Sequence, residues 1–180
     1  MNLKRRLLGL LVDPGREWSL IAAEPADVAG LYRHFIVTVA AIPSAALLLR
    51  FTVAGAPVLG ARAAAARYVV ALATPIAAAV IVEKLAPRFK STGNTGQALK
   101  LVAYSSAPVW IAGVFNLIPA LVGTATIVGV LYGIYLFALG LTRVLHTPRE
   151  QVVPFMVVCA IVFVVINILL AVILTSSRTI

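Results

Sequence analysis

The sequence predicts an all-α, polytopic membrane protein: a five-transmembrane-helix bundle that follows a cytoplasmic amphipathic N-terminal segment. Of the 180 residues, 62% are hydrophobic and only 12% are charged, with a mean hydropathy of +1.04. Soluble domains contain roughly 45–50% apolar and about 25% charged residues. The apolar residues also gather into runs close to the length of about 20 residues that a membrane-crossing helix needs.

The net charge of +9 would suggest nucleic-acid binding in a soluble protein. Here the Lys and Arg residues lie mostly between hydrophobic runs, which fits membrane orientation and anionic lipid headgroups. We therefore expect the lipid bilayer, and no nucleic acid, as a partner. The single cysteine, Cys159, lies in an apolar run and predicts a small buried side chain rather than a disulfide.

Residues 1–33 are too polar to cross a membrane and are expected to lie on the cytoplasmic leaflet as amphipathic helices. In "DPGREWSLIAAEP", Asp13 is the predicted N-cap and Pro14 the first helical residue. Trp18 then serves as an interfacial anchor at the headgroup level. The alternative is that these helices pack beneath the bundle. One side of the first helix is expected to carry Leu3, Leu7, Leu8 and Leu11.

Residues 34–177 form the predicted transmembrane domain. The uncharged run Leu101–Thr142 has 42 residues, which as a helix would measure about 63 Å, whereas the hydrocarbon core is about 30 Å thick. This run therefore predicts two spans that are joined by a turn around Pro119–Gly123. The five predicted spans are 34–54, 66–86, 99–118, 122–142 and 152–175.

The distribution of Lys and Arg orients these spans. An odd number of spans places the termini on opposite sides, and the side of the N-terminus then receives eleven of the basic residues against four. All six Asp and Glu residues fall on that same side. We therefore expect the N-terminus in the cytoplasm and the C-terminus on the opposite side of the membrane.

Each of the first three spans contains an interior proline. Proline removes a helix hydrogen bond, and the carbonyl that it frees is costly in lipid unless a nearby group satisfies it. The prolines are interpreted as static kinks that shape the bundle; the alternative is that they are hinges around a polar cavity. Ser105 and Ser106 lie three and two residues before Pro108 and are expected to compensate its missing hydrogen bond. The candidate residues for the kinks and the cavity are Pro43, Thr74, Pro75, Ser105, Ser106, Pro108 and Asn116.

In the fourth span, Gly129 and Gly133 form a small-xxx-small pair that lets helices approach closely, and we expect packing within the chain rather than dimerisation. Asn116 and Asn167 are expected to make interhelical hydrogen bonds, with a ligand path as the alternative. No Asp, Glu, Lys, Arg or His lies near the centre of a predicted span, which argues against ion pumps and proton-coupled transporters.

Catalysis has little support in the sequence. His34 and His146 lack the spaced His, Asp or Cys neighbours of a metal site, and the two serines of the third span have no nearby base. The stretch "GNTG" lacks the spacing and the lysine of a phosphate-binding loop and predicts a turn with Thr95 as a cap. We expect no catalytic residue, no metal and no cofactor, and hence no enzyme.

The order of "DPGREWSLIAAEP", "GLYRHFIVTVAAIPS", "ALKLVAYSSAPVWIAGVFNLIPALVG" and "LYGIYLFALGL" resembles the Yip (Ypt-interacting protein) domain family, above all its bacterial members. The resemblance covers nearly the whole chain. It implies a five-span protein of a bacterial cytoplasmic membrane with a cytoplasmic N-terminus. The residues that carry it are Pro14, Trp18, Tyr104, Ala107, Pro108, Tyr132, Tyr135, Gly140 and Leu141.

In eukaryotes the family is tied to vesicle traffic, Rab-type GTPases and membrane shaping. Here "GLY", Gly30–Tyr32, only partly matches the family's "D-L-Y-G-P" motif, so GTPase binding is not expected. The leading hypothesis is a non-enzymatic scaffold that organises the membrane or binds a membrane-protein partner or a second copy. The alternative is a channel or transporter for a small or lipidic solute that uses the three proline-containing spans; an intramembrane enzyme is a third option.

Overall fold

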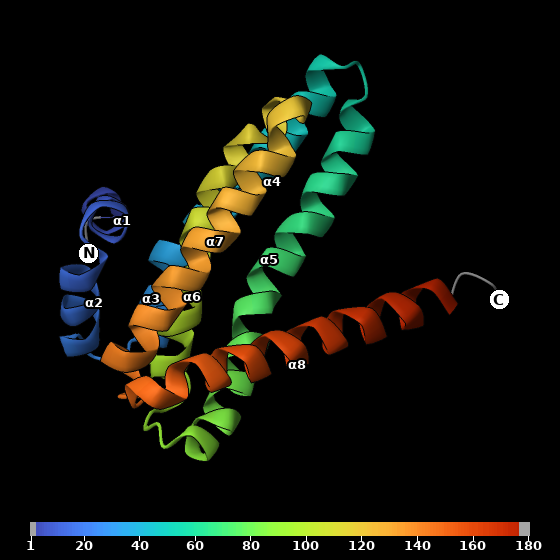
Figure 1. The fold of residues 1–180 in the computed structure, drawn as a ribbon. Coiled ribbons are helices and arrows are strands. Elements are labelled where there is room, and N and C mark those ends of the chain that lie inside the picture. Colours follow the sequence, from blue (N-terminus) through green and yellow to red (C-terminus); the bar gives the residue numbers. More distant parts are fainter. Residues whose placement is uncertain (1–2, 177–180) are drawn as a thin grey trace.

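The structure is a computed structural model that describes residues 3–176, with side chains up to residue 163 and at residue 165, and every regular element in this range is a helix (Figure 1). Two short 3₁₀ helices and one π-helical turn (labelled η) interrupt or extend the α-helices. In chain order the elements are α1 (Leu3–Val12), α2 (Pro14–Ala23), α3 (Val28–Leu31), η1 (Tyr32–Ile36), α4 (Val37–Val53), α5 (Pro57–Leu85), η2 (Ala86–Phe89), α6 (Thr95–Ala112), η3 (Gly113–Leu117), α7 (Pro119–Val144) and α8 (Arg149–Ser176).

Four helical stretches of the described residues are long and apolar enough to cross a membrane, and they overlap the first four predicted spans. The chain is therefore an all-helical, multi-pass membrane protein. The fifth predicted span corresponds to α8. Asn167, for which an interhelical hydrogen bond is predicted, lies outside the described side chains. The four stretches are Val28–Val53, Pro57–Phe89, Thr95–Leu117 and Pro119–Val144.

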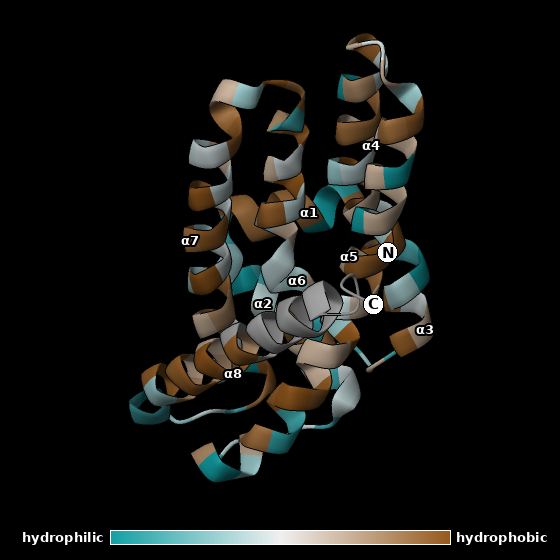
Figure 2. Cartoon of the chain, turned by 90° about the vertical axis from the view of Figure 1, so that its right-hand side faces the viewer, coloured by the Kyte–Doolittle hydropathy of each residue, from teal (hydrophilic) through white to brown (hydrophobic). Residues whose placement is uncertain are grey.

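These four stretches form two hairpins, α4–α5 and α6–α7, that lie side by side (Figure 2). We call the end with the α4–α5 and α6–α7 turns the apical end, and the end where α6 and α8 begin the basal end. The third stretch is central: 67% of its apolar window is buried, against 17% for the fourth. The outer helices thus present apolar side chains outward, as helices in contact with lipid do.

Local sequence explains where the spans begin. Pro119 is the first residue of α7, a position where its missing N–H costs no helix bond. The apical turn therefore lies just before Pro119, whereas the predicted turn residues Pro119–Gly123 belong to the beginning of α7. At the basal end, Asn94 and Gln97 form a capping box before α6. The prediction of Thr95 as the cap is wrong by one residue, because its hydroxyl donates to Glu83 of α5 instead (2.7 Å).

The first span begins earlier than the predicted residue 34. Asp27 caps α3, since its Oδ1 accepts a hydrogen bond from the backbone N–H of Gly30 (2.9 Å). From there α3, η1 and α4 continue as one helical stretch to Val53. The predicted boundary between an N-terminal segment and the transmembrane domain at residue 33 therefore falls inside a helix.

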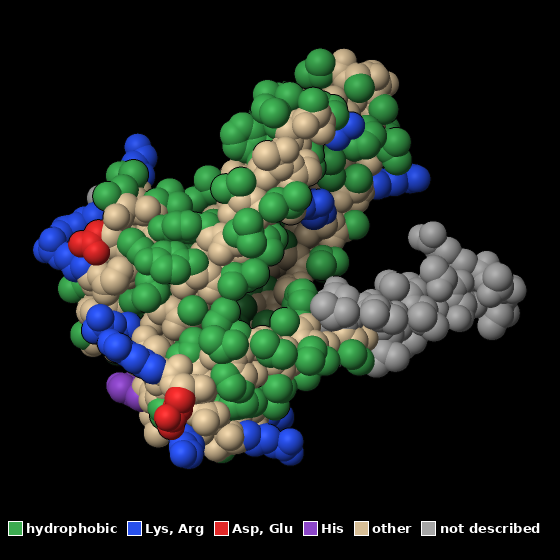
Figure 3. Space-filling view, in the orientation of Figure 1, with side chains coloured by type: hydrophobic (Ala, Val, Ile, Leu, Met, Phe, Trp, Pro, Cys, Tyr) green, Lys and Arg blue, Asp and Glu red, His purple; other side chains and the backbone are tan. Residues whose placement is uncertain are grey.

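Charged side chains gather around the N-terminal helices and the basal end, whereas hydrophobic side chains cover much of the remaining visible surface (Figure 3). Helices α1 and α2 pack on the outside of α6 and α7 (Figure 1). Helix α8 is attached at the basal end, where Phe155 is fully buried and its ring stacks on Phe89 with 4.7 Å between centroids. Beyond this contact α8 slants away from the bundle (Figure 1).

Candidate functional site

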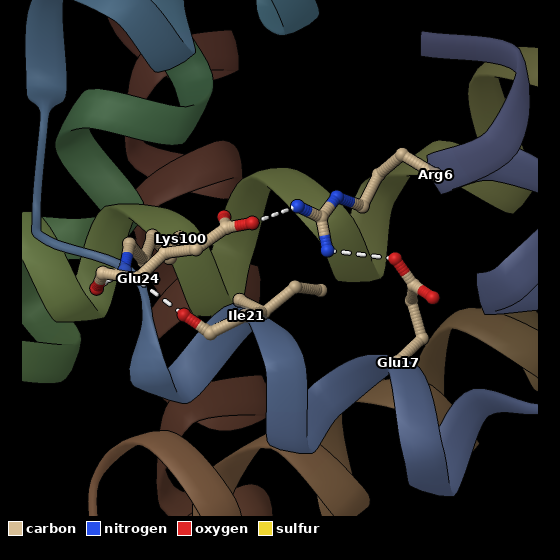
Figure 4. Close-up of polar contacts among 5 residues, drawn as sticks. All are labelled: Arg6, Glu17, Ile21, Glu24 and Lys100. Carbon is tan, nitrogen blue, oxygen red and sulfur yellow. Dashed lines mark hydrogen bonds and ion pairs between the residues drawn. The ribbon is translucent and has the colours of Figure 1, made fainter. Parts of the chain in front are cut away.

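A partly buried ion-pair network lies where the N-terminal helices meet the bundle (Figure 4). Arg6 of α1 is only 7% exposed and bridges two carboxylates: Nη1 donates to Oε1 of Glu17 (2.7 Å), and Nη2 donates to Oε1 of Glu24. Burial alone would lower the pKa of Arg6, but the hydrogen bond to Glu24 and the negative charges nearby outweigh it and raise the pKa. The guanidinium therefore stays charged, and both α1 and α2 are held by it.

Lys100 of α6 joins the network from the side of the bundle. It is 5% exposed, and its Nζ donates to the backbone carbonyls of Ile21 (3.0 Å) and Glu24. These carbonyls lie at the C-terminal end of α2, where the helix leaves acceptors without partners and where its dipole favours a cation. Lys100 thus caps α2 and binds it to the third span.

An aromatic cluster packs beside the network. Trp18, the predicted interfacial anchor, is fully buried, and its ring meets that of Tyr104 edge-on with centroids 6.2 Å apart. Phe35 of the first span contacts Tyr104 in the same way at 4.5 Å. Gly140 of α7 makes room for the indole, because a Cβ there would lie 2.9 Å from it. Trp18 therefore holds α2 against α6 and α7.

The side of α1 that faces the bundle differs in part from the predicted leucine side. Arg6 and Leu10 are buried, whereas Leu8 and Leu11 are exposed. Tyr132 of α7 also holds this helix, since its hydroxyl lies within hydrogen-bonding distance of the carbonyls of Leu10 (3.1 Å) and Leu11 (3.0 Å). The C-terminal end of α1 is thus capped by the bundle, as the end of α2 is.

The interior prolines of the first three predicted spans are buried, and none of them ends its helix: Pro43, Pro75 and Pro108. The Pro43 carbonyl accepts a hydrogen bond from Nδ2 of Asn116 (3.2 Å), which joins η3 to α4. Thr74 is half-buried, and its hydroxyl donates to the carbonyl of Val70 in its own helix (2.7 Å). The structure therefore places Asn116 and Thr74 in separate surroundings.

The serines of the third span were expected to compensate Pro108, and they do not. Ser106 donates to the carbonyl of Val102 in the preceding turn (2.8 Å). The Ser105 hydroxyl is buried, and no described residue offers it a hydrogen bond. Both serines line an apolar groove of about 480 Å³ between α5, α6, α7 and α8. The groove is not polar, and its lining includes neither Thr74 nor Asn116.

Gly129 and Gly133 bring α7 close to α6 of the same chain. A Cβ at Gly129 would lie 3.0 Å from the carbonyl oxygen of Pro108, and one at Gly133 would lie 2.8 Å from that of Ser105. Gly129 also lines a second apolar groove of about 550 Å³, which opens between α6 and α7 above the end of α1. Both grooves are thus bounded by the same close helix contact.

Sequence reasoning missed the ion-pair network because its members are far apart along the chain. Lys100 and Ile21 are separated by 79 residues, and Arg6 and Glu24 by 18. One signal was present, since Lys100 and Tyr104 are four residues apart and therefore share a face of α6. The network supplies charge-assisted hydrogen bonds at a junction of helices, which suits a rigid attachment rather than a reaction centre.

The comparison with protein-family models gives one result: the Yip1 domain model matches residues 8–173. The match begins within α1 and ends within α8, so it contains all four apolar stretches. Glu17, Glu24 and Lys100 lie inside the matched range, whereas Arg6 lies just before it. Searches of curated proteins and of solved structures found no match.

Proposed function

Because the chain belongs to the Yip1 domain family, we propose that it is a non-enzymatic scaffold of a bacterial cytoplasmic membrane, which organises the bilayer or binds a membrane-protein partner or a second copy. The attachment of α1 and α2 to the bundle is the observation that carries this proposal. Arg6, Lys100 and Trp18 fix both helices on the bundle. Their outward side chains then form a surface of constant shape, which a loose tail would not provide.

That surface combines apolar and basic side chains. Leu8 is 61% exposed and Leu20 is 47% exposed, and Lys4 and Arg16 are exposed on the same two helices. Exposed apolar groups beside basic ones suit contact with an anionic membrane surface or with another membrane protein. We call Lys4, Leu8, Arg16 and Leu20 the N-terminal surface.

We further propose that α8 is the fifth span. The bundle and α8 extend from the basal end in different directions (Figure 1). Both can cross the same membrane if the membrane normal lies between these two directions, so that each is tilted. Membrane helices tilt by about 20° on average, within a range of roughly 0–40°. The 28 residues of α8 extend about 42 Å, which is long enough for a tilted crossing of a core about 30 Å thick. This placement leaves α1 and α2 on the basal side.

The distribution of charge supports a cytoplasmic basal end. Of the 15 Lys and Arg residues, Arg178 lies outside the described residues and three belong to the apical half of the first hairpin. The other eleven belong to the N-terminal helices, to the basal ends of the spans or to the connections between them. The three apical residues are Arg50, Arg62 and Arg67.

Cysteine labelling tests this topology. With Cys159 replaced by alanine, Asn2→Cys and Thr92→Cys should react with a membrane-impermeant maleimide from the cytoplasmic face. Ala54→Cys, in the apical turn, and Arg178→Cys should react from the opposite face. Labelling of residues 2 and 178 from the same face would contradict the five-span topology.

Photo-crosslinking from the N-terminal surface tests the scaffold function. A crosslinking amino acid at Leu20 should give a discrete protein adduct in native membranes, and the adduct should disappear in the Arg6→Ala variant. The matched control is Val58, which is equally apolar and 67% exposed but lies at the apical end. Identical adducts from both positions, or none from Leu20, would contradict the proposal.

A channel or transporter is the second candidate, and the groove beside Ser105 and Ser106 is the observation that favours it. Because this groove of about 480 Å³ is apolar, it suits a lipidic solute better than an ion. Proteoliposomes that contain the purified protein should then move a labelled lipid between leaflets faster than empty liposomes. Equal rates would remove this candidate.

A further inference from the structure

A cavity of about 410 Å³ lies next to the ion-pair network, between the α2–α3 connection, the start of the first span and α6. Its floor is formed by three buried residues, which are Lys100 (5% exposed), Tyr104 (2%) and Leu31 (7%). The exposed polar side chains at its rim are Glu24, Asp27 and His34. The cavity is therefore charged on both floor and rim, unlike the two apolar grooves.

The cavity lies at the boundary between headgroups and hydrocarbon in the membrane placement proposed above, on which this inference rests. Lys100 is the last charged residue before the uncharged run that begins at Leu101. Asp27 directly precedes the first apolar stretch. A ligand at this level reaches the cavity from the basal leaflet, so a phospholipid headgroup is available there without leaving the membrane.

The floor provides a cation for an anionic group. A lysine ammonium has three donors, and Lys100 uses two of them for the carbonyls of Ile21 and Glu24. The third N–H of Lys100 thus has no partner among the described residues, and Lys100 lines the cavity. A buried ammonium with an unused donor suits a phosphate oxygen.

The rim provides acceptors for a cationic group. Asp27 uses Oδ1 for its cap of α3, and Glu24 uses Oε1 for Arg6, but a carboxylate accepts about four hydrogen bonds, so capacity remains. Nδ1 of His34 lies 3.0 Å from the carbonyl of Gly30 and must donate to it. Because Nδ1 carries the proton in this hydrogen bond, Nε2 is an acceptor in the neutral tautomer. Three acceptor groups thus surround the mouth of the cavity.

We propose that this cavity binds the headgroup of an ethanolamine phospholipid, with the phosphate at Lys100 and the primary ammonium between Glu24, Asp27 and His34. The headgroup carries both charges two carbons apart, which matches a cationic floor and an anionic rim. Its ammonium has three N–H donors, whereas the choline group has none. An anionic glycerol headgroup would face the two carboxylates without a cation to neutralise them. The volume falls in the range of roughly 300–1,000 Å³ that is usual for ligand sites.

A methylation series of one lipid tests the proposal. The full-length protein in mild detergent is mixed with dioleoyl phosphatidylethanolamine that carries no, one, two or three N-methyl groups, and bound lipid is counted by native mass spectrometry. All four lipids share the phosphate, the positive charge and the acyl chains, and each added methyl group replaces one N–H donor by a larger apolar group. We expect retention to fall along the series, by about tenfold from end to end, which is the effect of one or two charge-assisted hydrogen bonds.

The Asp27→Asn variant locates the site. Asparagine caps helices as well as aspartate does, so α3 should form while the carboxylate charge is lost. The preference for the unmethylated lipid should fall to about threefold or less. The matched control is Glu150→Gln, which removes one exposed carboxylate from the first turn of α8 and should leave the preference unchanged. Lys100 is left intact because it also caps α2.

Equal retention of the four lipids by the native protein, tighter binding of phosphatidylglycerol, or an unchanged preference in a Glu24→Gln, Asp27→Asn double variant would overturn the proposal. Soluble glycerophosphoethanolamine that binds as tightly as the lipid would overturn the membrane source of the ligand. The labelling experiment separates this inference from the topology. If residues 2 and 178 were labelled from opposite faces and the four lipids were retained equally, the headgroup site would be refuted and the five-span topology would stand.

Discussion

The basal and apical halves of the molecule are held together in different ways. In the basal half, Arg6 and Lys100 join α1, α2 and α6 through charge-assisted hydrogen bonds between segments that are distant in sequence. In the apical half, small residues allow helices to touch: a Cβ at Gly113 would lie 2.4 Å from Cβ of Pro43. A hydrogen bond from the Asn116 side chain to the Pro43 carbonyl also joins two helices of the apical half.

This difference follows from the surroundings of each half. Between lipid tails, helices gain little from hiding apolar side chains, so close packing and occasional polar bonds hold them together. In the membrane placement that we propose, α1 and α2 lie near the headgroups, where the bilayer does not confine them, so their attachment needs specific bonds. Charges that become buried there must be paired, because an unpaired buried charge is costly.

The largest expected effect is that of Arg6→Ala in the basal half. The substitution leaves Glu17, whose side chain is 13% exposed, without its cation. We expect the free energy of unfolding to fall by about 3–5 kcal/mol and α1 to detach. Unfolding in mixed micelles measures the first effect, and trypsin cleavage after Arg16, in the first turn of α2 and present in both variants, measures the second. The control is Lys4→Ala on the exposed side of α1; an equal effect of both variants would contradict the role of the ion pairs.

Gly140→Ala should have the next largest effect. Its added methyl group would enter the space between α7, α6 and the Trp18 ring of α2. Its Cβ would lie 2.4 Å from Cδ1 of Leu101 and 2.9 Å from the Trp18 ring. Leu101 can rotate, but the large indole is fully enclosed, so we expect a loss of about 1–3 kcal/mol. The matched control in the same helix is Gly123→Ala, where no atom lies within 4 Å. Equal melting temperatures of the two variants would contradict this account.

Asn116→Ala tests the apical half, and we expect a smaller loss of about 1 kcal/mol, which is typical of one hydrogen bond between membrane helices. The control is Thr74→Val, which removes a bond within a single helix and should cost about 0.5 kcal/mol or less. Unfolding in mixed micelles measures both variants. A loss at Asn116 as large as that of Arg6→Ala would remove the contrast between the halves.

The transmembrane helices were predictable because length and hydropathy report directly on membrane crossing. The uncharged run from Leu101 predicted a turn near Pro119, where α7 begins. Asp13 was predictable as the N-cap of α2 from local chemistry alone, and its Oδ1 accepts a hydrogen bond from the N–H of Arg16 (3.2 Å). In both cases the residues that predict the feature lie close to it in the sequence, within one helical turn or one span.

The burial of Arg6 was not predictable in this way. A leucine-rich helix with charges predicts that the leucines face inward, yet Leu8 faces outward and Arg6 inward. The cause lies in carboxylates 11 and 18 residues further along the chain, which neutralise the guanidinium once α2 folds back on α1. Hydrophobic periodicity contains no information on such a partner, and the candidate site was missed for this reason.

The smallest expected effect concerns Ser105 and Ser106, neighbours on α6 in different situations. Ser106 donates to a helix carbonyl (2.8 Å), whereas Ser105 is buried without a partner among the described residues. Because an unpaired buried hydroxyl is unfavourable, Ser105→Ala should raise the free energy of unfolding by about 0.5–1 kcal/mol. Ser106→Ala should lower it by about 0.5 kcal/mol or less.

If unfolding in mixed micelles showed that Ser105→Ala destabilises the protein more than Ser106→Ala, the Ser105 hydroxyl would have a partner in the apolar groove. That result would favour a lipidic solute there and hence the transport alternative.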